Sequence, residues 1–197
     1  MDGRPDFWLI AGPNGVGKTT YAFRTVAKLT GSVNFINLDE IARGLAPLAP
    51  ETARARAGRV AFRAIDEMLA ERQSFSLETT LAGRAQLRLV AKAEQAGYRT
   101  HLLFFFIDRV EICLERIARR VAEGGHFVPE ADARRRFTRG LAHLPFYAAE
   151  VDDWRLFDAT HPEPKIVAEG EGKKVRFSSS GGDMPQAIKD CLEKLNF

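Results

Sequence analysis

The sequence predicts an α/β protein with a parallel sheet of about five strands and helices on both faces. Two observations lead to this prediction. Five apolar runs of strand length alternate with longer segments of helical periodicity, as in repeated strand–helix–strand units. A glycine-rich segment also joins the first apolar run directly to the first helical segment. We expect one domain over residues 1–197, with its core at about residues 7–160.

The strands are placed on uninterrupted apolar runs, and the helices on amphipathic segments between them. The expected strands are Phe7–Ala11, Val33–Asn37, Ser74–Glu78, Thr100–Asp108 and Arg155–Asp158. The expected helices are Lys18–Leu29, Glu51–Arg72, Arg84–Ala96, Val110–Ala122 and Pro129–Glu150. In the tail, at about residues 164–197, Lys165–Ala168 and Lys174–Phe177 flank a Gly-containing turn and predict a hairpin. A short helix ending at Leu195 follows.

Composition narrows the class of protein. The chain is 45% hydrophobic and 28% charged, and no apolar run is long enough to cross a bilayer. We expect a cytoplasmic protein without a secretory signal, whose two cysteines, Cys113 and Cys191, are reduced. The net charge of +3 comes with arginine clusters that sit in helical patterns and lack interleaved aromatic residues. Small phosphate-bearing molecules are therefore the expected partners, rather than a membrane or a nucleic acid.

The glycine-rich segment Gly12–Thr19 reads G-x-x-x-x-G-K-T and lies between an expected strand and an expected helix. In this context the pattern predicts a P-loop, whose backbone N–H groups bind the phosphates of ATP or GTP. Lys18 would reach the β- and γ-phosphates, and the Thr19 hydroxyl would bind Mg²⁺. The expected nucleotide-binding residues here are Gly12, Pro13, Asn14, Gly15, Val16, Gly17, Lys18, Thr19 and Thr20.

Ligands of a parallel sheet bind at the carboxyl ends of its strands, so polar residues there are candidates for the site. Asp39 follows the second strand and either takes the proton of an acceptor hydroxyl or caps a helix that begins at Glu40; both roles are compatible. Glu78, Thr79 and Thr80 end the third strand as candidate substrate ligands, although Thr79 or Thr80 could instead cap a helix. Asp108 ends the fourth strand, where helix capping is favoured over magnesium binding.

An arginine-rich region surrounds the glycine-containing segment 123–129. Two helices joined by a glycine hinge, with arginines on both sides, predict a lid that closes over phosphates. Guanidinium groups grip phosphate oxygens in pairs and offset charge in the transition state. Arg120, Arg134 and Arg136 are the candidates, and Lys18, Asp39, Arg120 and Arg136 together make the expected catalytic set. His126 is interpreted as a hinge or capping residue.

The chain contains, in order, the motifs GPNGVGKTT, NLDEIA, SFSLETTLAG and RIARRVAEGGHFVPE, followed by RRRF. Together these motifs resemble the zeta-toxin family of P-loop kinases over about residues 7–160. The resemblance implies Mg²⁺-dependent transfer of phosphate from ATP or GTP to the 3′-hydroxyl of UDP-N-acetylglucosamine. It assigns phosphate binding to Lys18, magnesium binding to Thr19, the general base to Asp39 and substrate binding to Glu78 and Thr80. Arg120 and one arginine of 134–136 resemble the lid arginines of the family. A separately encoded antitoxin is an implied partner.

Two other functions remain as alternatives. The segment Leu81–Gln86 superficially resembles the signature loop of ABC-type ATPases, and Leu103–Asp108 resembles a Walker B strand, but Arg109 stands where such ATPases place a catalytic Glu. A polynucleotide kinase or RNA-binding protein would also be basic. It would need an aromatic stacking platform for bases, for which the sequence offers no pattern.

Overall fold

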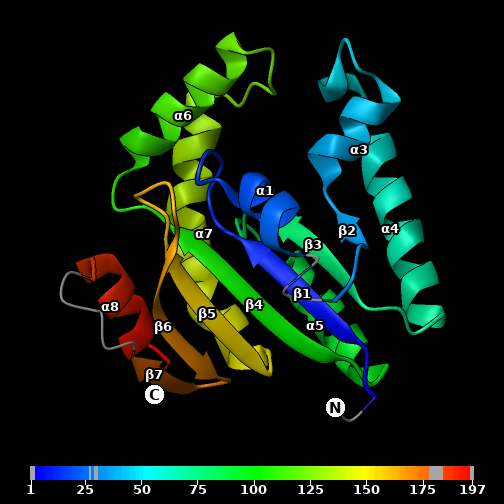
Figure 1. The fold of residues 1–197 in the computed structure, drawn as a ribbon, viewed down its shortest axis with the longest axis vertical. Helices are drawn as coiled ribbons and strands as arrows, with labels where there is room; N and C mark the ends of the chain where they lie inside the picture. Colours follow the sequence, from blue (N-terminus) through cyan, green and yellow to red (C-terminus); the bar gives the residue numbers. More distant parts are fainter. Residues whose placement is uncertain (1–2, 27, 29–30, 178–183, 196–197) are drawn as a thin grey trace.

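The computed structural model describes residues 3–26, 28, 31–177 and 184–195. In this part of the chain, one sheet of seven strands has the order β2-β3-β1-β4-β5-β6-β7 (Figure 1). The first five in this order are parallel, and β6 and β7 are added antiparallel at one edge. The strands are β1 (Asp6–Ala11), β2 (Phe35–Ile36), β3 (Phe75–Thr79), β4 (Arg99–Phe106), β5 (Asp153–Asp158), β6 (Lys165–Glu171) and β7 (Lys174–Phe177).

The five expected strands are all present, but the expected count of about five is too low. The C-terminal hairpin forms β6 and β7 and joins the same sheet. Only a short segment connects β5 to β6, and such a connection allows antiparallel pairing without the helical crossover that a parallel strand requires. The sheet is therefore mixed rather than wholly parallel.

Most helices agree with expectation, but the helix over 38–45 was expected only as an alternative that began at Glu40. They are α1 (Lys18–Tyr21), the π-helical turn η1 (Ala22–Val26), α3 (Leu38–Leu45), the 3₁₀ turn η2 (Pro50–Ala53), α4 (Arg54–Ala70), α5 (Ala85–Gln95), α6 (Val110–Ala122), α7 (Glu130–Glu150) and α8 (Gln186–Glu193). The first expected helix extended to Leu29; its positions 27 and 29, and position 30 after it, lie outside the described residues. The expected helix from Glu51 divides into η2 and α4.

Helices cover both faces of the sheet, as the alternating pattern predicts (Figure 1). On one face, residues of α4, α5, α7 and α8 pack with Phe7, Leu9, Phe75 and Phe104 in the largest hydrophobic cluster. On the other face, α1 and α6 cover a smaller cluster that includes Phe105. No helix among the described residues is long and apolar enough to cross a membrane.

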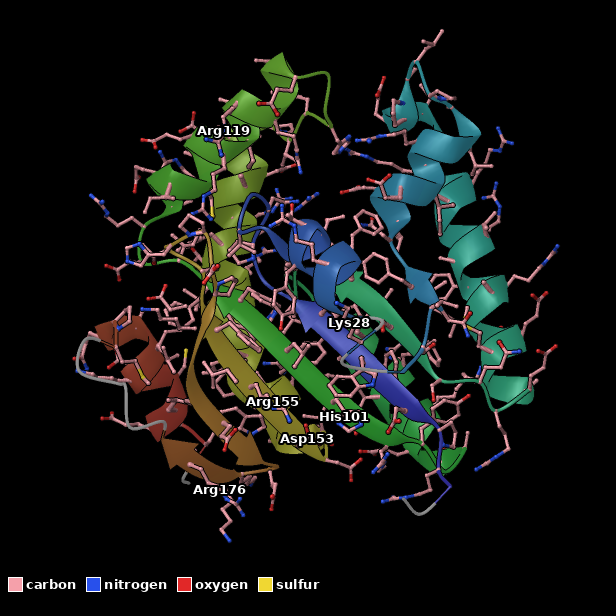
Figure 2. The ribbon with its side chains drawn as sticks, in the orientation of Figure 1. Lys28, His101, Arg119, Asp153, Arg155 and Arg176 are labelled. Carbon is pink, nitrogen blue, oxygen red and sulfur yellow. The ribbon has the colours of Figure 1, made fainter. Side chains whose placement is uncertain are left out.

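The pairing register brings the P-loop and the segments after β3 and β4 together at the carboxyl ends of the strands. Strand β1 lies between β3 and β4, with Ala11 opposite both Thr79 and Phe104. Because all three strands run in the same direction, the P-loop after β1 emerges beside the ends of β3 and β4. Arg119 on α6 lies at this carboxyl-terminal edge, whereas His101 and Asp153 lie toward the opposite end of the sheet (Figure 2).

Candidate active site

The glycines of the P-loop are required by close packing beneath it. Gly12 has φ +141°, and a Cβ there would lie 2.3 Å from the carbonyl oxygen of Phe105. Gly15 has φ +80°, and a Cβ there would lie 2.4 Å from the carbonyl oxygen of Cys113. Neither position has room for a side chain, and both backbone conformations favour glycine. The loop is therefore held against β4 and α6 in one shape, with α1 beginning at Lys18.

A cavity of about 770 Å³ opens above the P-loop at the carboxyl edge of the sheet. This volume is in the range of about 300–1,000 Å³ that small-molecule sites occupy. Five segments line it: the P-loop with α1 and η1, the start of α3, the end of β3, α6 with the loop after it, and the segment after β5. Of the expected nucleotide-binding residues, the run from Asn14 to Thr20 lines the cavity, and Gly12 and Pro13 precede it.

Lys18 is buried at the floor of this cavity, with 5% of its side chain exposed. Its Nζ donates a hydrogen bond to the carbonyl oxygen of Pro13 at 2.9 Å and lies 3.7 Å from Oε1 of Glu78. Burial lowers the pKa of Lys18 because it removes the ammonium group from water, and the charge of Glu78 opposes this effect. An anion bound in the loop would stabilise the charged lysine further.

Glu78 stands at the centre of the polar contacts around the P-loop. Its Oε2 accepts hydrogen bonds from the Thr19 hydroxyl at 2.8 Å and from Nδ2 of Asn37 at 2.9 Å. The Thr19 hydroxyl and the Glu78 carboxylate offer hard oxygen ligands, which are the kind that Mg²⁺ binds. Magnesium at phosphate sites uses one or two such groups and takes its other ligands from phosphate and water. The residues present therefore fit a magnesium ion bound together with a nucleotide.

Asp39 lines the cavity from the first turn of α3, and its side chain is 50% exposed. The interpretation of Asp39 as a helix cap is wrong, because Asn37 is the N-cap of α3. Oδ1 of Asn37 accepts hydrogen bonds from the backbone N–H groups of Asp39 and Glu40 at 2.9 and 3.2 Å. The carboxylate of Asp39 is thus not used for capping and faces the cavity, with Nε2 of His126 at 3.8 Å.

Thr79 and Thr80 are not among the residues that line the cavity. The hydroxyl of Thr79 accepts the backbone N–H of Leu81 at 3.2 Å, and the Thr80 carbonyl packs against Gly140 of α7. Neither caps a helix, since the N-cap of α5 is Arg84. Their substrate-binding role stays a prediction.

Asp108 is exposed and also lies outside the cavity. The favoured interpretation of Asp108 as a cap is wrong, because α6 follows Arg109 and no side chain caps it.

The expected lid arginines have different surroundings. Arg120 lines the cavity, and its Nη2 donates to the backbone carbonyl of His126 at 2.8 Å. Arg136 of α7 donates from Nη1 to Oδ1 of the P-loop residue Asn14 at 3.1 Å. Arg134 instead pairs on the surface with Glu111 and Glu130, at 2.9 Å each. Arg120 and Arg136 are therefore near the P-loop, whereas the nucleotide contact expected of Arg134 stays a prediction.

Sequence reasoning missed Arg116, which lines the cavity and joins three segments. Its Nη1 donates to the carbonyl oxygens of Ala159 at 3.0 Å and Val16 at 3.3 Å, and its Nη2 donates to Thr160 at 2.9 Å. A spacing of four residues from Arg120 places both on the same face of α6, and this spacing is visible in the sequence. The contact of Arg116 with the segment after β5 cannot be read from the sequence.

Comparison with known proteins agrees with this architecture. The AAA domain family matches residues 7–142. An uncharacterized protein of Haemophilus influenzae is 34% identical over 126 residues, which are 64% of this chain and 88% of that protein. The match with a family over more than half of the chain is direct evidence of membership.

Solved structures share the fold at low identity. A chain of the AvrRxo1-ORF1:-ORF2 complex is 16% identical with a TM-score of 0.73, covering 96% of this chain and 64% of that chain. This protein thus spans less than two thirds of that relative's length. A chain of the PezAT chromosomal toxin–antitoxin system of Streptococcus pneumoniae is 14% identical with a TM-score of 0.68, covering 99% of this chain and 86% of that chain. A candidate kinase from Chloroflexus aurantiacus is 18% identical with a TM-score of 0.53, covering 69% of this chain and 80% of that chain. These likenesses show that the chain shares its fold with these proteins, and the matched model shows that it belongs to the AAA domain family.

Proposed function

We propose that this protein is a kinase that transfers the γ-phosphate of ATP or GTP to a hydroxyl of a small molecule, with Mg²⁺. The observation that carries the proposal is the position of Asp39. Its half-exposed carboxylate faces the same cavity as the P-loop, and among the described residues its side chain has no partner closer than the 3.8 Å contact with His126. A carboxylate in this position can accept a proton from a hydroxyl brought to the γ-phosphate.

The nucleotide half of the proposed site comprises the P-loop and α6. The backbone N–H groups of the loop and Lys18 bind the phosphates, and Arg120 and Arg136 offset negative charge there. Arg116 and the segment after β5, which line the cavity, would form a wall for the nucleobase. Thr19 and Glu78 would hold Mg²⁺, which when bound neutralises charge on the β- and γ-phosphate oxygens.

The proposed transfer is a single displacement at phosphorus. The acceptor hydroxyl oxygen forms a bond to the γ-phosphorus, and the bond between that phosphorus and the bridging oxygen breaks. The hydroxyl proton passes to the Asp39 carboxylate, and the nucleoside diphosphate leaves. Positioning and electrostatic stabilisation account for most catalysis in such reactions. The residues proposed for these roles line the cavity, except Arg136, which reaches the P-loop through Asn14.

A nucleotide sugar such as UDP-N-acetylglucosamine is the acceptor we propose to test first. The support is the series of motifs that resembles the zeta-toxin family, together with the shared fold of the PezAT chain. The same likeness supports a separate antitoxin as a partner of this protein. No observation favours the ABC-type alternative. Its Walker B candidate, Asp108, lies outside the cavity, and the segment Leu81–Gln86 is bound to α7 through Tyr147 and His143.

Labelled ATP with Mg²⁺ and a panel of hydroxyl-bearing metabolites that includes UDP-N-acetylglucosamine tests the proposal. Label should appear on an acceptor. Release of free phosphate alone, at a rate independent of every acceptor, would instead indicate an ATPase. The Asp39→Asn variant should lose roughly 10²–10⁴-fold in turnover, the range for a positioned base. Its ATP affinity, measured by calorimetry, should stay within about twofold because Asp39 does not belong to the nucleotide half.

The matched control is Asp108→Asn, which changes an exposed carboxylate at another strand end and outside the cavity. Its turnover should equal that of the wild type. Near-wild-type turnover in Asp39→Asn would remove Asp39 from the mechanism.

A further inference from the structure

The loop between α6 and α7 is folded tightly against the end of α6. Gly124 has φ +80°, and the backbone N–H of Gly125 donates to the carbonyl oxygen of Arg120 at 2.8 Å. A Cβ at Gly125 would lie 2.4 Å from Cγ of Arg120, so the turn has no room for a side chain at this position. Val128 is buried with Ile117 and Ala133 and fixes the other end of the loop. Both flanks thus hold the residue between them, His126, in place.

The backbone of His126 holds an arginine of the nucleotide half. Its carbonyl oxygen accepts the hydrogen bond from Nη2 of Arg120 at 2.8 Å. The Nε of Arg120 is buried and has no hydrogen-bond partner among the described residues. A buried N–H without an acceptor costs about 1–3 kcal/mol, so this guanidinium is one that an anionic ligand would stabilise.

The side chain of His126 faces Asp39 and the start of α3, which we call the acceptor half of the proposed site. It is 12% exposed, and its Nε2 lies 3.8 Å from Oδ1 of Asp39 on α3. This separation is longer than a hydrogen bond, and contacts of catalytic groups commonly shorten when the substrate binds. Burial lowers the pKa of His126, the carboxylate of Asp39 opposes this, and the charges of Arg54, Arg120 and Arg43 lower it further. Burial and these arginines thus favour the neutral form of the ring.

We infer that His126 is a positioning residue that sets the carboxylate of Asp39 through its ring and the guanidinium of Arg120 through its backbone. The inference rests on the proposed kinase function and adds a residue that links its two halves. The neutral ring limits the directions in which the Asp39 carboxylate can turn, so that the carboxylate stays available to the acceptor hydroxyl. A protonated ring would form an ion pair with Asp39 and compete for the same oxygens. The groups that face the ring are Asp39 and Arg43 of α3, Arg54 of α4 and Arg120 of α6.

Kinetics of three variants test the inference. His126→Ala should lower kcat roughly 10–100-fold, as expected from the loss of orientation of a catalytic group. Its KM for ATP should stay within about twofold, because the backbone carbonyl that holds Arg120 remains. His126→Gln should restore part of kcat, since its amide can still contact the carboxylate. Phe127→Ala is the matched control: it lies in the same loop, is 61% exposed, does not line the cavity and should leave both constants unchanged.

The pH profile gives a second kinetic result. The wild-type kcat should fall as the pH falls through the lowered pKa of His126, and this limb should be missing in His126→Ala. A kcat of His126→Ala equal to that of Phe127→Ala, or an effect on KM for ATP alone, would overturn the inference.

A titration of the His126 ring by NMR does not depend on activity. Because the Asp39 carboxylate raises the pKa of His126, Asp39→Asn should lower it relative to wild type. An unchanged pKa in Asp39→Asn would overturn the inference about His126 and leave the kinase proposal standing. If wild-type protein transfers phosphate to no acceptor, the proposed function fails, even where the titration shows the two side chains in contact.

Discussion

At the scale of single residues, Glu78 explains how a phosphate site can be stable before phosphate binds. A buried ammonium without a counter-charge is costly, and Lys18 has Glu78 at 3.7 Å. The same carboxylate accepts hydrogen bonds from the Thr19 hydroxyl and from the side-chain amide of Asn37. It therefore orders both the hydroxyl that is proposed to bind magnesium and the N-cap residue of α3. One side chain thus joins the P-loop to the acceptor half of the cavity.

Changing Glu78 to Gln should weaken magnesium–nucleotide binding while leaving the fold intact. Glutamine keeps the shape and one acceptor oxygen, but it loses the charge that attracts a cation. A lost charged contact is worth about 1.5–3 kcal/mol, or roughly a 10–100-fold higher Kd for ATP measured by calorimetry with Mg²⁺. Binding of ATP in EDTA should change little.

Glu115→Gln is the control, because Glu115 is an exposed carboxylate on α6 that does not line the cavity. Equal Kd values for Glu78→Gln and wild type in the presence of Mg²⁺ would exclude Glu78 as a magnesium ligand.

At the scale of elements, α6 determines the shape of the nucleotide half. The helix packs beneath the P-loop through Cys113, whose carbonyl faces Gly15, and Arg116 then reaches the P-loop and the segment after β5. Burial raises the pKa of the Cys113 thiol to about 11, so this cysteine serves as packing rather than as a nucleophile. The proposed nucleobase wall depends on one guanidinium.

Arg116→Ala should destabilise the protein and weaken nucleotide binding together, because the backbone carbonyls of Val16, Ala159 and Thr160 lose their common donor. We expect a loss of about 1.5–3 kcal/mol in the free energy of unfolding, measured by urea denaturation, and a clear rise in the Kd for ATP. Arg116→Lys should not restore either value, since one ammonium group cannot reproduce the planar fork.

Arg88→Ala provides the matched control for this change, as Arg88 is an exposed arginine of α5 outside the cavity. Should Arg116→Ala unfold like Arg88→Ala, the bridging role of Arg116 would be wrong.

At the scale of the whole molecule, the two ends of the sheet are built differently. At the amino-terminal end, His101 contacts Asp153 at 2.6 Å and Asp6 at 3.1 Å, and its ring stacks on Trp8 (Figure 2). Side-chain pairs close that end across three strands. The cavity lies at the carboxyl end, and parts of the molecule away from it also contribute to the stability of the fold.

The C-terminal helix α8 is one such source. Ile188, Cys191 and Leu192 are buried in the large cluster on the face opposite α1 and α6. Ile188→Ala should cost about 2–5 kcal/mol in unfolding free energy, as for other large-to-small core changes. Nucleotide affinity should stay within about twofold, because α8 contributes no residue to the cavity lining.

Lys189→Ala, at the exposed neighbour of Ile188, should leave both quantities unchanged. A large loss of nucleotide affinity in Ile188→Ala, measured under conditions where the protein is folded, would contradict the separation of stability from the site.

Several features of this protein could be predicted from the sequence because their physical causes are local. The glycine positions, the apolar run before them and the lysine after them are adjacent in the chain, and they predict the strand, loop and helix of the P-loop together. The helix α6 matches its expected bounds, Val110–Ala122, because its amphipathic spacing is continuous. Asn37 before Asp39 and Glu40 is also a local capping signal. Sequence reasoning assigned it to the wrong residue.

By itself, the sequence determined that the chain is α/β, that it carries a phosphate-binding loop, and that Asp39, Glu78 and Arg120 are its candidate partners. Only the tertiary structure decided which side chains lie against one another. The contact of Thr19 with Glu78 spans 59 residues, and that of Asn14 with Arg136 spans 122. The contact between His126 and Asp39 joins a loop to a separate helix. Such contacts depend on strand order and on which face a helix presents, and these follow from packing the whole chain around one sheet rather than from any local pattern.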